Sequence, residues 1–573
     1  MLGHNNLKKS SVIAFLAVLL LLTMAMFTPH GSITAKSGYW YSLAPPLLAI
    51  ALVMLTQRLI FSLLVGVLAG GLLVVLPEQG ITAIGSGVIT GPLYILQSVS
   101  NPSNLRILFF ITCMLMMISV IVTSGGFQAI VRWLKQYATD PYSSKLITAL
   151  MGLVIFIDDY ANTLIIGNAM RPVTDQQKIS REKLAFLVDS TSAPIAGLAF
   201  ISSWIGYEVG LFSELSKSLA INKNGYAIFL DALGYRFYCI LLIIFVFTHI
   251  LLKRDFGPML KAEQRARLTG ALEDKNARPL QAAVFISQKA APEAREKAIT
   301  AIVPISGLVA CLISLLFVTG NGPALVGQGH SVFSLNTWQI IVTAIPNTTI
   351  LLACSGLLGL VLACCFARFY SKVSSKSIGK ALLAGVKTSL LPLSILILAW
   401  SLKQSVDALH TGQYIISVAG DSITPQFFPA IIFAIACVTA FTIGTSFGTM
   451  GIILPVAIPL AYQLDGSTYG LLTIISMAAV LDGAIFGDHC SPLSDTTIMS
   501  SVSTSCDHIH HVKTQAPYAI TVGMIAIVCG YLPAAAGLSN LWCLLLGATA
   551  IMTTLLIIGR QIQTPASPNQ ATT

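Results

Sequence analysis

The stretch FIDDYANTLIIGNAM places two adjacent carboxylates, Asp158 and Asp159, inside an otherwise apolar run. An ionised carboxylate at mid-membrane costs about 2.5–3.5 kcal/mol even on the gentlest insertion scale, which favours a functional role. Adjacent helical residues point about 100° apart, so the two acids cannot share one partner. Asp159, Asn162 and Thr163 do share a helix face, and their oxygens suit a hard monovalent cation. Capping of a helix that begins near Tyr160 is the alternative role for both acids.

A second polar stretch, FLVDSTSAPIAGLAFISSWIGYE, occupies residues 186–208. Asp189 and three hydroxyl residues, of which Ser192 is the last, precede Pro194, and a proline there disfavours a continuous helix. Unwound backbone would expose carbonyl groups that can coordinate an ion. The alternatives are hydroxyls that bond back to their own helix and a shallow capping role for Asp189 near a cytoplasmic loop.

The stretch FTIGTSFGTMGIILPVAIP, at residues 441–459, combines hydroxyl residues with glycines and prolines. Its glycine spacing is typical of close helix packing, whereas Pro455 and Pro459 favour a broken helix. Ser446 and Thr449 are the candidate ligands in this stretch. Both interpretations stay open from the sequence.

The richest stretch is LDGAIFGDHCSPLSDTTIMSS, at residues 481–501. Asp488, Ser491 and Asp495 are its candidate functional residues. Carboxylates that share a desolvated site cannot all stay ionised, so one can hold a proton at one moment and a cation at another. A solvated surface loop is the alternative, although it does not explain the apolar flanks on both sides.

Two further features involve His, Cys and Arg residues. His489-Cys490 and the run Cys506-Asp507-His508 raise a zinc alternative, but the spacing matches no defined zinc signature. Among the charges inside apolar segments, Asp231 and Arg236 are close in sequence, and we expect them to form a structural ion pair.

The elements that must hold these residues are membrane helices. Of 573 residues, 55% are hydrophobic and only 10% are charged, whereas soluble domains average about 25% charged residues. A spanning helix needs about 20 apolar residues, so we expect an all-α polytopic protein with roughly 11–14 transmembrane segments. The N-terminal run is interpreted as a retained span rather than a signal peptide. The clear apolar stretches are 11–29, 59–77, 107–124, 184–205, 237–252, 299–319, 339–366, 381–400, 427–443, 468–486, 516–535 and 541–558, with more broken ones near 41–56, 80–98, 146–170, 445–462 and 488–503.

The net charge of +10 does not indicate nucleic acid, because Lys and Arg concentrate in loops that flank the spans. The eleven cysteines lie mostly in apolar segments and predict no disulfide framework. Residues 253–298 contain ten Lys or Arg and six acids, which predicts a cytoplasmic linker. The linker separates a first transmembrane half, 1–252, from a second half, 299–573. If all five candidates before residue 125 span, Arg132, Lys135 and Lys145 fall outside, so one of these five segments is expected to be re-entrant.

Each half carries a pair of polar, glycine-rich or proline-rich interruptions. Matching interruptions in two halves indicate two inverted repeats with broken or re-entrant helices near the midplane. Coincidence is the alternative, since Gly and Pro are common in membrane helices.

Five segments in order, FIDDYAN, ISREKLAFLVDSTSAPIA, WIGYE, GTSFGTMGIILPVAIP and GDHCSPLSDTTIMSS, resemble the NhaC-type sodium/proton antiporter family. That family is grouped with a broader superfamily of ion and organic-anion transporters. The resemblance covers most of 150–210 and 380–515. It implies a multi-pass protein of the plasma (bacterial inner) membrane that exports cytoplasmic Na+ in exchange for entering protons.

The resemblance and the chemistry together give a predicted site. The ion- and proton-coupling acids are Asp158, Asp159, Asp189, Asp488 and Asp495. The neutral ligands are Asn162, Thr163, Ser192, Ser446, Thr449 and Ser491, with Na+ placed at Asp159, Asn162 and Asp488. The expected partners are Na+, H+ and the lipid bilayer, with a homodimer as one assembly and no cofactor or nucleic acid.

Three rival functions stay open. An organic acid or amino acid could use the same site with Na+ or H+ as coupling ion, although no arginine lies inside the four polar stretches. An intramembrane enzyme is the second rival, but Gly-x-Gly-Asp and His-Glu-x2-His patterns are absent from the sequence. A channel is the third, and it would not depend on a proton gradient. The phosphate-binding Gly-x4-Gly-Lys-Ser/Thr motif is also absent, so no ATP is required.

Overall fold

The structure is a computed structural model that describes residues 40–56, 58–79, 83–279, 290–411, 414 and 424–562. The predicted span at 11–29 and part of the linker, 280–289, lie outside the described residues. Within them the fold is helical, apart from one antiparallel pair, β1 (Arg254–Asp255) with β2 (Arg560–Gln561). The predicted all-α class is therefore confirmed.

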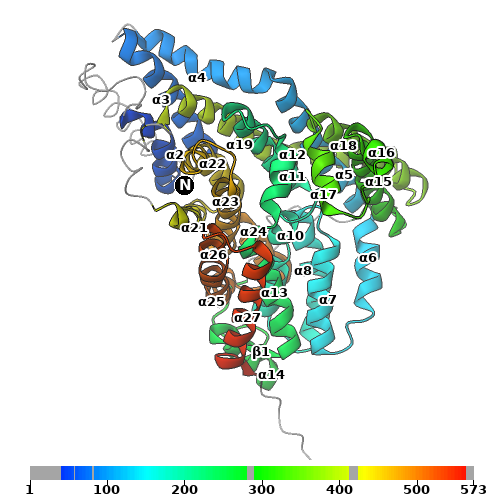
Figure 1. Ribbon diagram of the computed structural model, residues 1–573. Helices are drawn as coiled ribbons and strands as arrows, with labels where there is room; N and C mark the ends of the chain where they lie inside the picture. Colours follow the sequence, from blue (N-terminus) through cyan, green and yellow to red (C-terminus); the bar gives the residue numbers. More distant parts are fainter. Residues whose placement is uncertain are drawn as a thin grey trace, which may run out of the picture.

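Figure 1 labels most of these elements in chain order. The elements before the linker are η1 (Trp40–Leu43), α2 (Ala44–Thr56), α3 (Leu59–Gln79), α4 (Ala83–Ser100), α5 (Pro102–Ser124), α6 (Gly126–Lys135), α7 (Pro141–Val154), α8 (Asp159–Gln176), α9 (Arg181–Ser190), α10 (Ala193–Ala196), α11 (Ser203–Ser218), α12 (Gly225–Leu233) and α13 (Phe237–Leu252). The linker holds α14 (Gly257–Thr269), and the elements after it are α15 (Ile299–Thr319), α16 (Gly322–Gly327), α17 (Leu335–Thr343), α18 (Thr349–Phe369), α19 (Ser375–Ala408), η4 (Pro425–Phe427), α21 (Phe428–Ile443), α22 (Ser446–Leu464), α23 (Leu471–Cys490), α24 (Asp495–Thr504), α25 (His508–Ile525), η5 (Ala526–Tyr531), α26 (Leu532–Ala535) and α27 (Asn540–Ile557).

Among the described residues, nine helices are long and apolar enough to cross a membrane, and the pair α12 and α13, bent by 46°, would make a tenth. The apolar segments Trp40–Thr56, which includes α2, and Leu59–Val75, within α3, are shorter. The apolar stretch 184–205 is not one span, because α9 ends at Ser190 and α11 begins only at Ser203. The expected unwinding before Pro194 therefore occurs.

Helices α7 and α8 form a hairpin, called hairpin 1, whose tip is 155–158. The two ends of the hairpin meet, because the Gln177 amide donates to the Thr139 carbonyl at 2.9 Å. Figure 1 shows the two helices side by side. The broken candidate near 146–170 is thus a hairpin of two helices rather than one span, and which of the five segments before residue 125 is re-entrant stays a prediction. Lys145 lies at the base of hairpin 1, where it pairs with Glu263 of the linker.

Helices α21 and α22 form a second hairpin, called hairpin 2, whose tip is Gly444-Thr445. Phe428, the first residue of α21, packs against Leu460, Ala461 and Leu464 at the end of α22. The two helices are therefore antiparallel.

The hairpins open on opposite faces of the molecule. The base of hairpin 1 lies on the linker face, where the Arg267 guanidinium of α14 donates to the Gln177 carbonyl at 3.3 Å. Tyr469 follows the open end of hairpin 2 and lies on the other face of the molecule. Its hydroxyl donates to Asp231 at 3.0 Å. Such opposed hairpins are what an inverted repeat requires.

Two broken spans also run in opposite directions. The first, α9 to α11, begins on the linker face, and the second, α23 to α24, ends there, since the Arg181 guanidinium donates to the Ser505 carbonyl at 3.1 Å. The inverted repeat itself, and the division at 253–298, stay predictions.

Candidate ion site at the hairpin tips

Asp158 and Asp159 have different roles at the tip of hairpin 1. Asp158 has extended backbone and caps α8, accepting from the Ala161 N–H at 2.9 Å and from the Ser203 hydroxyl at 2.8 Å. Capping is therefore the correct interpretation for Asp158. Asp159 is instead the first residue of α8, is 2% exposed, and keeps Oδ2 without a hydrogen-bond partner.

Asn162 fixes the tip to the first break. Its amide donates to the carbonyls of Gly152 at 2.9 Å, Ile155 at 3.0 Å and Thr191 at 3.0 Å, so one side chain joins both arms of hairpin 1 to the end of α9. A Cβ at Gly152 would lie 2.1 Å from the Thr191 hydroxyl, so this close approach needs glycine. Asn162 Oδ1 and the Thr163 hydroxyl, both buried, have no partner.

The tip of hairpin 2 is tied to the second broken span through Asp488. Gly444 has φ +73°, a left-handed conformation that glycine adopts easily, and it reverses the chain between α21 and α22. The Ser446 hydroxyl and N–H donate to Asp488 Oδ2 at 2.8 and 3.3 Å, while Asp488 Oδ1 has no partner. The Thr449 hydroxyl donates back to the Thr445 carbonyl at 3.0 Å.

The break between α23 and α24 holds the remaining predicted residues of the second half. The Ser491 hydroxyl donates to the Phe441 carbonyl at 2.6 Å, which ties the break to hairpin 2. Asp495 begins α24, accepts from the Thr496 N–H at 2.9 Å, and accepts from the Tyr160 hydroxyl of hairpin 1. Asp482 and Asp488 are 0% and 2% exposed, so the solvated-loop interpretation is wrong.

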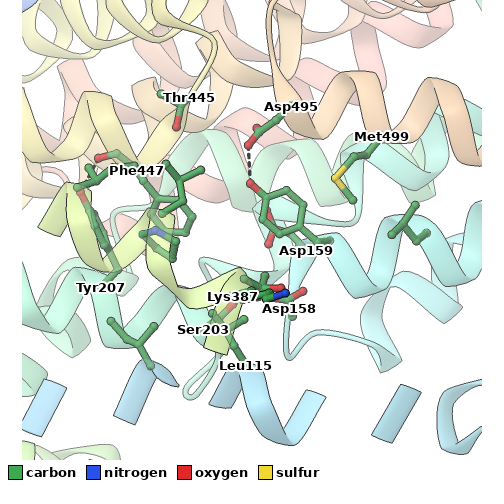
Figure 2. A pocket seen from close by; sticks show the side chains of 17 residues that line it. Leu115, Asp158, Asp159, Ser203, Tyr207, Lys387, Thr445, Phe447, Asp495 and Met499 are labelled. Atoms are coloured by element: carbon green, nitrogen blue, oxygen red, sulfur yellow. Dashed lines mark hydrogen bonds between the residues drawn. The ribbon is translucent and has the colours of Figure 1, made fainter. Parts of the chain in front are cut away.

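A cavity of about 360 Å³ lies against these tips and breaks. Figure 2 shows its lining, where the dashed line is the Tyr160–Asp495 hydrogen bond. Three predicted acids line it, together with residues that the sequence did not select. The polar lining residues are Asp158, Asp159, Tyr160, Ser203, Tyr207, Lys387, Thr388, Thr445 and Asp495.

Two of the cavity residues that were not predicted as site residues, Tyr160 and Lys387, have recognisable features in the sequence. Tyr160 follows the two acids directly in the sequence, and its hydroxyl donates to Asp495. Lys387 is one of four lysines in helix α19 and lies in its apolar part, between Lys380 and Lys403, which marks it as an unusual intramembrane charge but does not predict its position. Within the described part of the chain, Lys387 lines the cavity without an ion pair.

Four of the predicted residues present unpartnered oxygens. Almost all buried polar atoms in proteins are hydrogen-bonded, so a group of exceptions requires a reason. A hard cation is satisfied by carboxylate, amide and hydroxyl oxygens. The four atoms, out of sixteen such buried atoms in the described residues, are Asp159 Oδ2, Asn162 Oδ1, Thr163 Oγ1 and Asp488 Oδ1, and of these residues Asp159 lines the cavity.

Asp189 lies in a separate cluster and does not line the cavity. It accepts from the Gln515 amide at 2.7 Å, and His511 Nε2 lies 3.2 Å away. Asp189 lies at the end of α9, whose N-cap is Ser180, so the shallow capping interpretation is wrong. The Ser192 hydroxyl donates to the Asp189 carbonyl at 2.8 Å.

Two expectations about other charged groups can also be compared with the structure. Among the described residues, no three His, Cys, Asp or Glu side chains have an arrangement that could hold a metal ion. The predicted Asp231–Arg236 pair is wrong. Asp231 pairs with Lys223 at 2.6 Å, while Arg236 pairs with Glu208 and Asp482 from distant helices.

Comparisons with known proteins identify the family of the chain. Residues 195–533 match the Na+/H+ antiporter family. An uncharacterised protein of Haemophilus influenzae is 31% identical over 499 residues, which cover 87% of this chain and 91% of that protein. The Na(+)/H(+) antiporter NhaC of Alkalihalophilus pseudofirmus is 30% identical over 160 residues, 27% of this chain and 32% of that protein. The arginine/ornithine antiporter ArcD of Halobacterium salinarum is 33% identical over 105 residues, 18% of this chain and 21% of that protein.

Among solved structures, the Alcanivorax borkumensis YdaH transporter aligns with a TM-score of 0.52 and 13% identity, over 78% of this chain and 90% of that one. This likeness shows the fold of a membrane transporter. The family match spans more than half of the chain, and the Haemophilus influenzae relative matches nearly its whole length. The chain therefore belongs to the Na+/H+ antiporter family, as a multi-pass membrane transporter rather than an enzyme.

Proposed function

We propose that the protein exchanges cytoplasmic Na+ for external H+ at the tips of the two hairpins. The single observation that carries the proposal is the group of unpartnered buried oxygens on Asp159, Asn162, Thr163 and Asp488. The sequence predicts all four residues as ion ligands or coupling acids. The family match supports Na+ and H+ as the transported ions.

In the proposed mechanism, proton and cation compete for the same carboxylates. When the site faces the side of low pH, Asp159 and its neighbours take up protons. When it faces the other side, they release them, and Na+ binds to oxygens of Asp159, Asn162 and Asp488. Rearrangement of the hairpins and broken spans moves the site between the faces, driven by the proton gradient.

The other predicted ligands hold these oxygens in position. Ser446 donates to Asp488, Ser192 donates within its own break, and Ser491 ties the second break to hairpin 2. Each of these hydroxyls donates a hydrogen bond to a protein acceptor, and the lone pairs of its oxygen stay available to a cation. Asp189, held by Gln515 and His511, is assigned to proton coupling rather than to Na+.

The test is Na+-driven proton movement in proteoliposomes that contain a pH-sensitive dye. Wild type should move protons when Na+ is added, and Asp159→Asn should lose this response. Asp274→Asn, a carboxylate change in the linker, is the matched control and should keep it. A wild type that is silent to Na+, Li+ and K+ would overturn the proposal.

A second candidate function is the coupled transport or exchange of a small organic acid or amino acid. Two observations favour it: the cavity of about 360 Å³ is far larger than one Na+, and Lys387 lines it. An arginine/ornithine antiporter is among the similar proteins. In the same assay, this function predicts proton movement on addition of a carboxylate or amino acid rather than of Na+ alone.

A further inference from the structure

A buried cluster of charge lies apart from the cavity, around Arg236. This residue precedes α13 and is 0% exposed. Its Nε donates to Asp482 Oδ1 of α23 at 2.7 Å. Its Nη1 lies 3.3 Å from both carboxyl oxygens of Glu208 on α11, and 3.2 Å from the Gly197 carbonyl in the first break. One guanidinium therefore links two broken spans.

The formal charges of this cluster do not balance. Glu208 and Asp482 are both 0% exposed and share a single positive charge. The other titratable groups here are Tyr238, Cys239 and Tyr531, which are neutral in their ordinary forms and supply no cation. In the described part of the chain, no second Lys, Arg or His pairs with either carboxyl. An unbalanced buried charge is costly, so one carboxyl is expected to hold a proton.

The hydrogen bonds distinguish the two carboxyls. Asp482 accepts from Arg236 Nε at 2.7 Å, from the Tyr238 N–H at 2.8 Å and from the Tyr531 hydroxyl at 2.7 Å, so both of its oxygens are acceptors. Glu208 is contacted by a single nitrogen at 3.3 Å, and that nitrogen also serves Gly197. Short bonds to both oxygens stabilise an ionised carboxylate, whereas Glu208 lacks them.

We propose that Glu208 carries a proton in this state and that it is a further proton-exchanging carboxyl of the transporter. It adjoins Tyr207, which lines the cavity, and it shares α11 with Ser203, the partner of Asp158. Release of its proton would draw Arg236 from the Gly197 carbonyl towards Glu208, which links protonation to the shape of the first break. That Glu208 holds a proton follows from the contacts alone. That it exchanges this proton during transport rests on the proposed function.

Infrared spectroscopy tests for the proton without any transport. A protonated carboxylic acid has a carbonyl-stretch band that carboxylates lack. At near-neutral pH, Glu208→Gln should lose one component of this band, while Glu214→Gln, on the same helix, should match wild type. Asp482→Asn leaves Arg236 with only Glu208 as a partner, so Glu208 should ionise and the same component should disappear.

A band unchanged in both Glu208→Gln and Asp482→Asn would overturn the assignment. If one variant does not fold, the other still decides. The exchange step is tested by the H+:Na+ ratio, measured from the Na+ gradient that balances an imposed pH gradient. Glu208→Gln should lose one proton from this ratio, and Glu214→Gln should not. An unchanged ratio would overturn the exchange step alone, while a wild type without Na+-driven proton movement would overturn the proposed function and leave the infrared result standing.

Discussion

The Tyr160 hydroxyl of hairpin 1 donates a hydrogen bond to Asp495, the first residue of α24, across 335 positions of the chain. Both residues line the cavity. The bond therefore joins an element from before the linker to one from after it, in the cavity that Asp159, one of the proposed ion ligands, also lines. Movement of either element would change the position of a carboxylate in the cavity.

Tyr160→Phe removes this bond and keeps the ring. A hydrogen bond to a charged group contributes about 1.5–3 kcal/mol, so we expect Na+-driven proton movement to slow by roughly tenfold or more, since about 1.4 kcal/mol is a factor of ten. The measurement is the initial rate of dye response in proteoliposomes. Tyr137→Phe, at a residue 51% exposed, is the control and should keep the wild-type rate. Equal rates in the two variants would contradict the role of the bond.

The sequence located the polar interruptions because their signals are local. Pro194 and the acids of 481–501 stand out within apolar runs, and each marks a break in the structure. The sequence did not distinguish a single long helix from a helical hairpin at 146–170. That distinction depends on whether the two ends meet, as Gln177 and Thr139 do, and this is a tertiary contact.

The partners of buried charges could not be predicted from the sequence for the same reason. Proximity in sequence pairs Arg236 with Asp231, five positions away. In the structure Arg236 contacts Glu208 and Asp482, 28 and 246 positions away. Asp189 similarly contacts His511, 322 positions away. A charge inside an apolar segment signals that it has a partner, but only the packing of helices identifies it.

Gly444 offers a test of the tip of hairpin 2. A Cβ at this residue would lie 2.6 Å from the Leu493 carbonyl oxygen, in addition to the strain of its φ of +73°. The strain alone costs about 1–2 kcal/mol. Gly466 has φ +72° with nothing within 4 Å of a Cβ, so Gly466→Ala measures the strain by itself. We expect Gly444→Ala to lower the thermal unfolding midpoint further than Gly466→Ala does. Equal midpoints would show that the tip tolerates the clash.

Asp140 gives a pH-dependent prediction at the base of hairpin 1. It caps α7, and the hydrogen bond from the Ser143 hydroxyl lowers the pKa of its carboxyl, with further bonds from the N–H groups of Tyr142 and Ser143. A lowered pKa means that the ionised form stabilises the fold, so the stabilisation is present above the ordinary value of about 3.9 and is lost as pH falls through the lowered value.

Asp140→Ala should therefore reduce stability at pH 7 by about 1 kcal/mol, as for other helix caps. The gap in unfolding midpoint between this variant and wild type should narrow as the pH falls below the ordinary carboxyl value. Asp140→Ser keeps a capping oxygen that does not titrate, so its midpoint should stay close to wild type at pH 7. A gap between Asp140→Ala and wild type that is constant with pH would contradict the assignment.

Lys387 separates the two candidate functions, because one charge has opposite effects on them. In a cavity that binds Na+, a lysine repels the cation. At an effective dielectric constant of about 20, a unit charge roughly 8–16 Å away contributes ~1–2 kcal/mol. Lys387→Gln should then lower the Na+ concentration for half-maximal proton movement by roughly tenfold, since about 1.4 kcal/mol is a factor of ten.

If the cavity binds an organic carboxylate, the same lysine is its counter-ion. Lys387→Gln should then abolish the response to that substrate, while Lys387→Arg should retain part of it. Lys380→Gln, on the same helix but outside the cavity lining, is the matched control. A Lys387→Gln variant with wild-type responses to both Na+ and organic acids would show that the lysine does not act on the bound substrate.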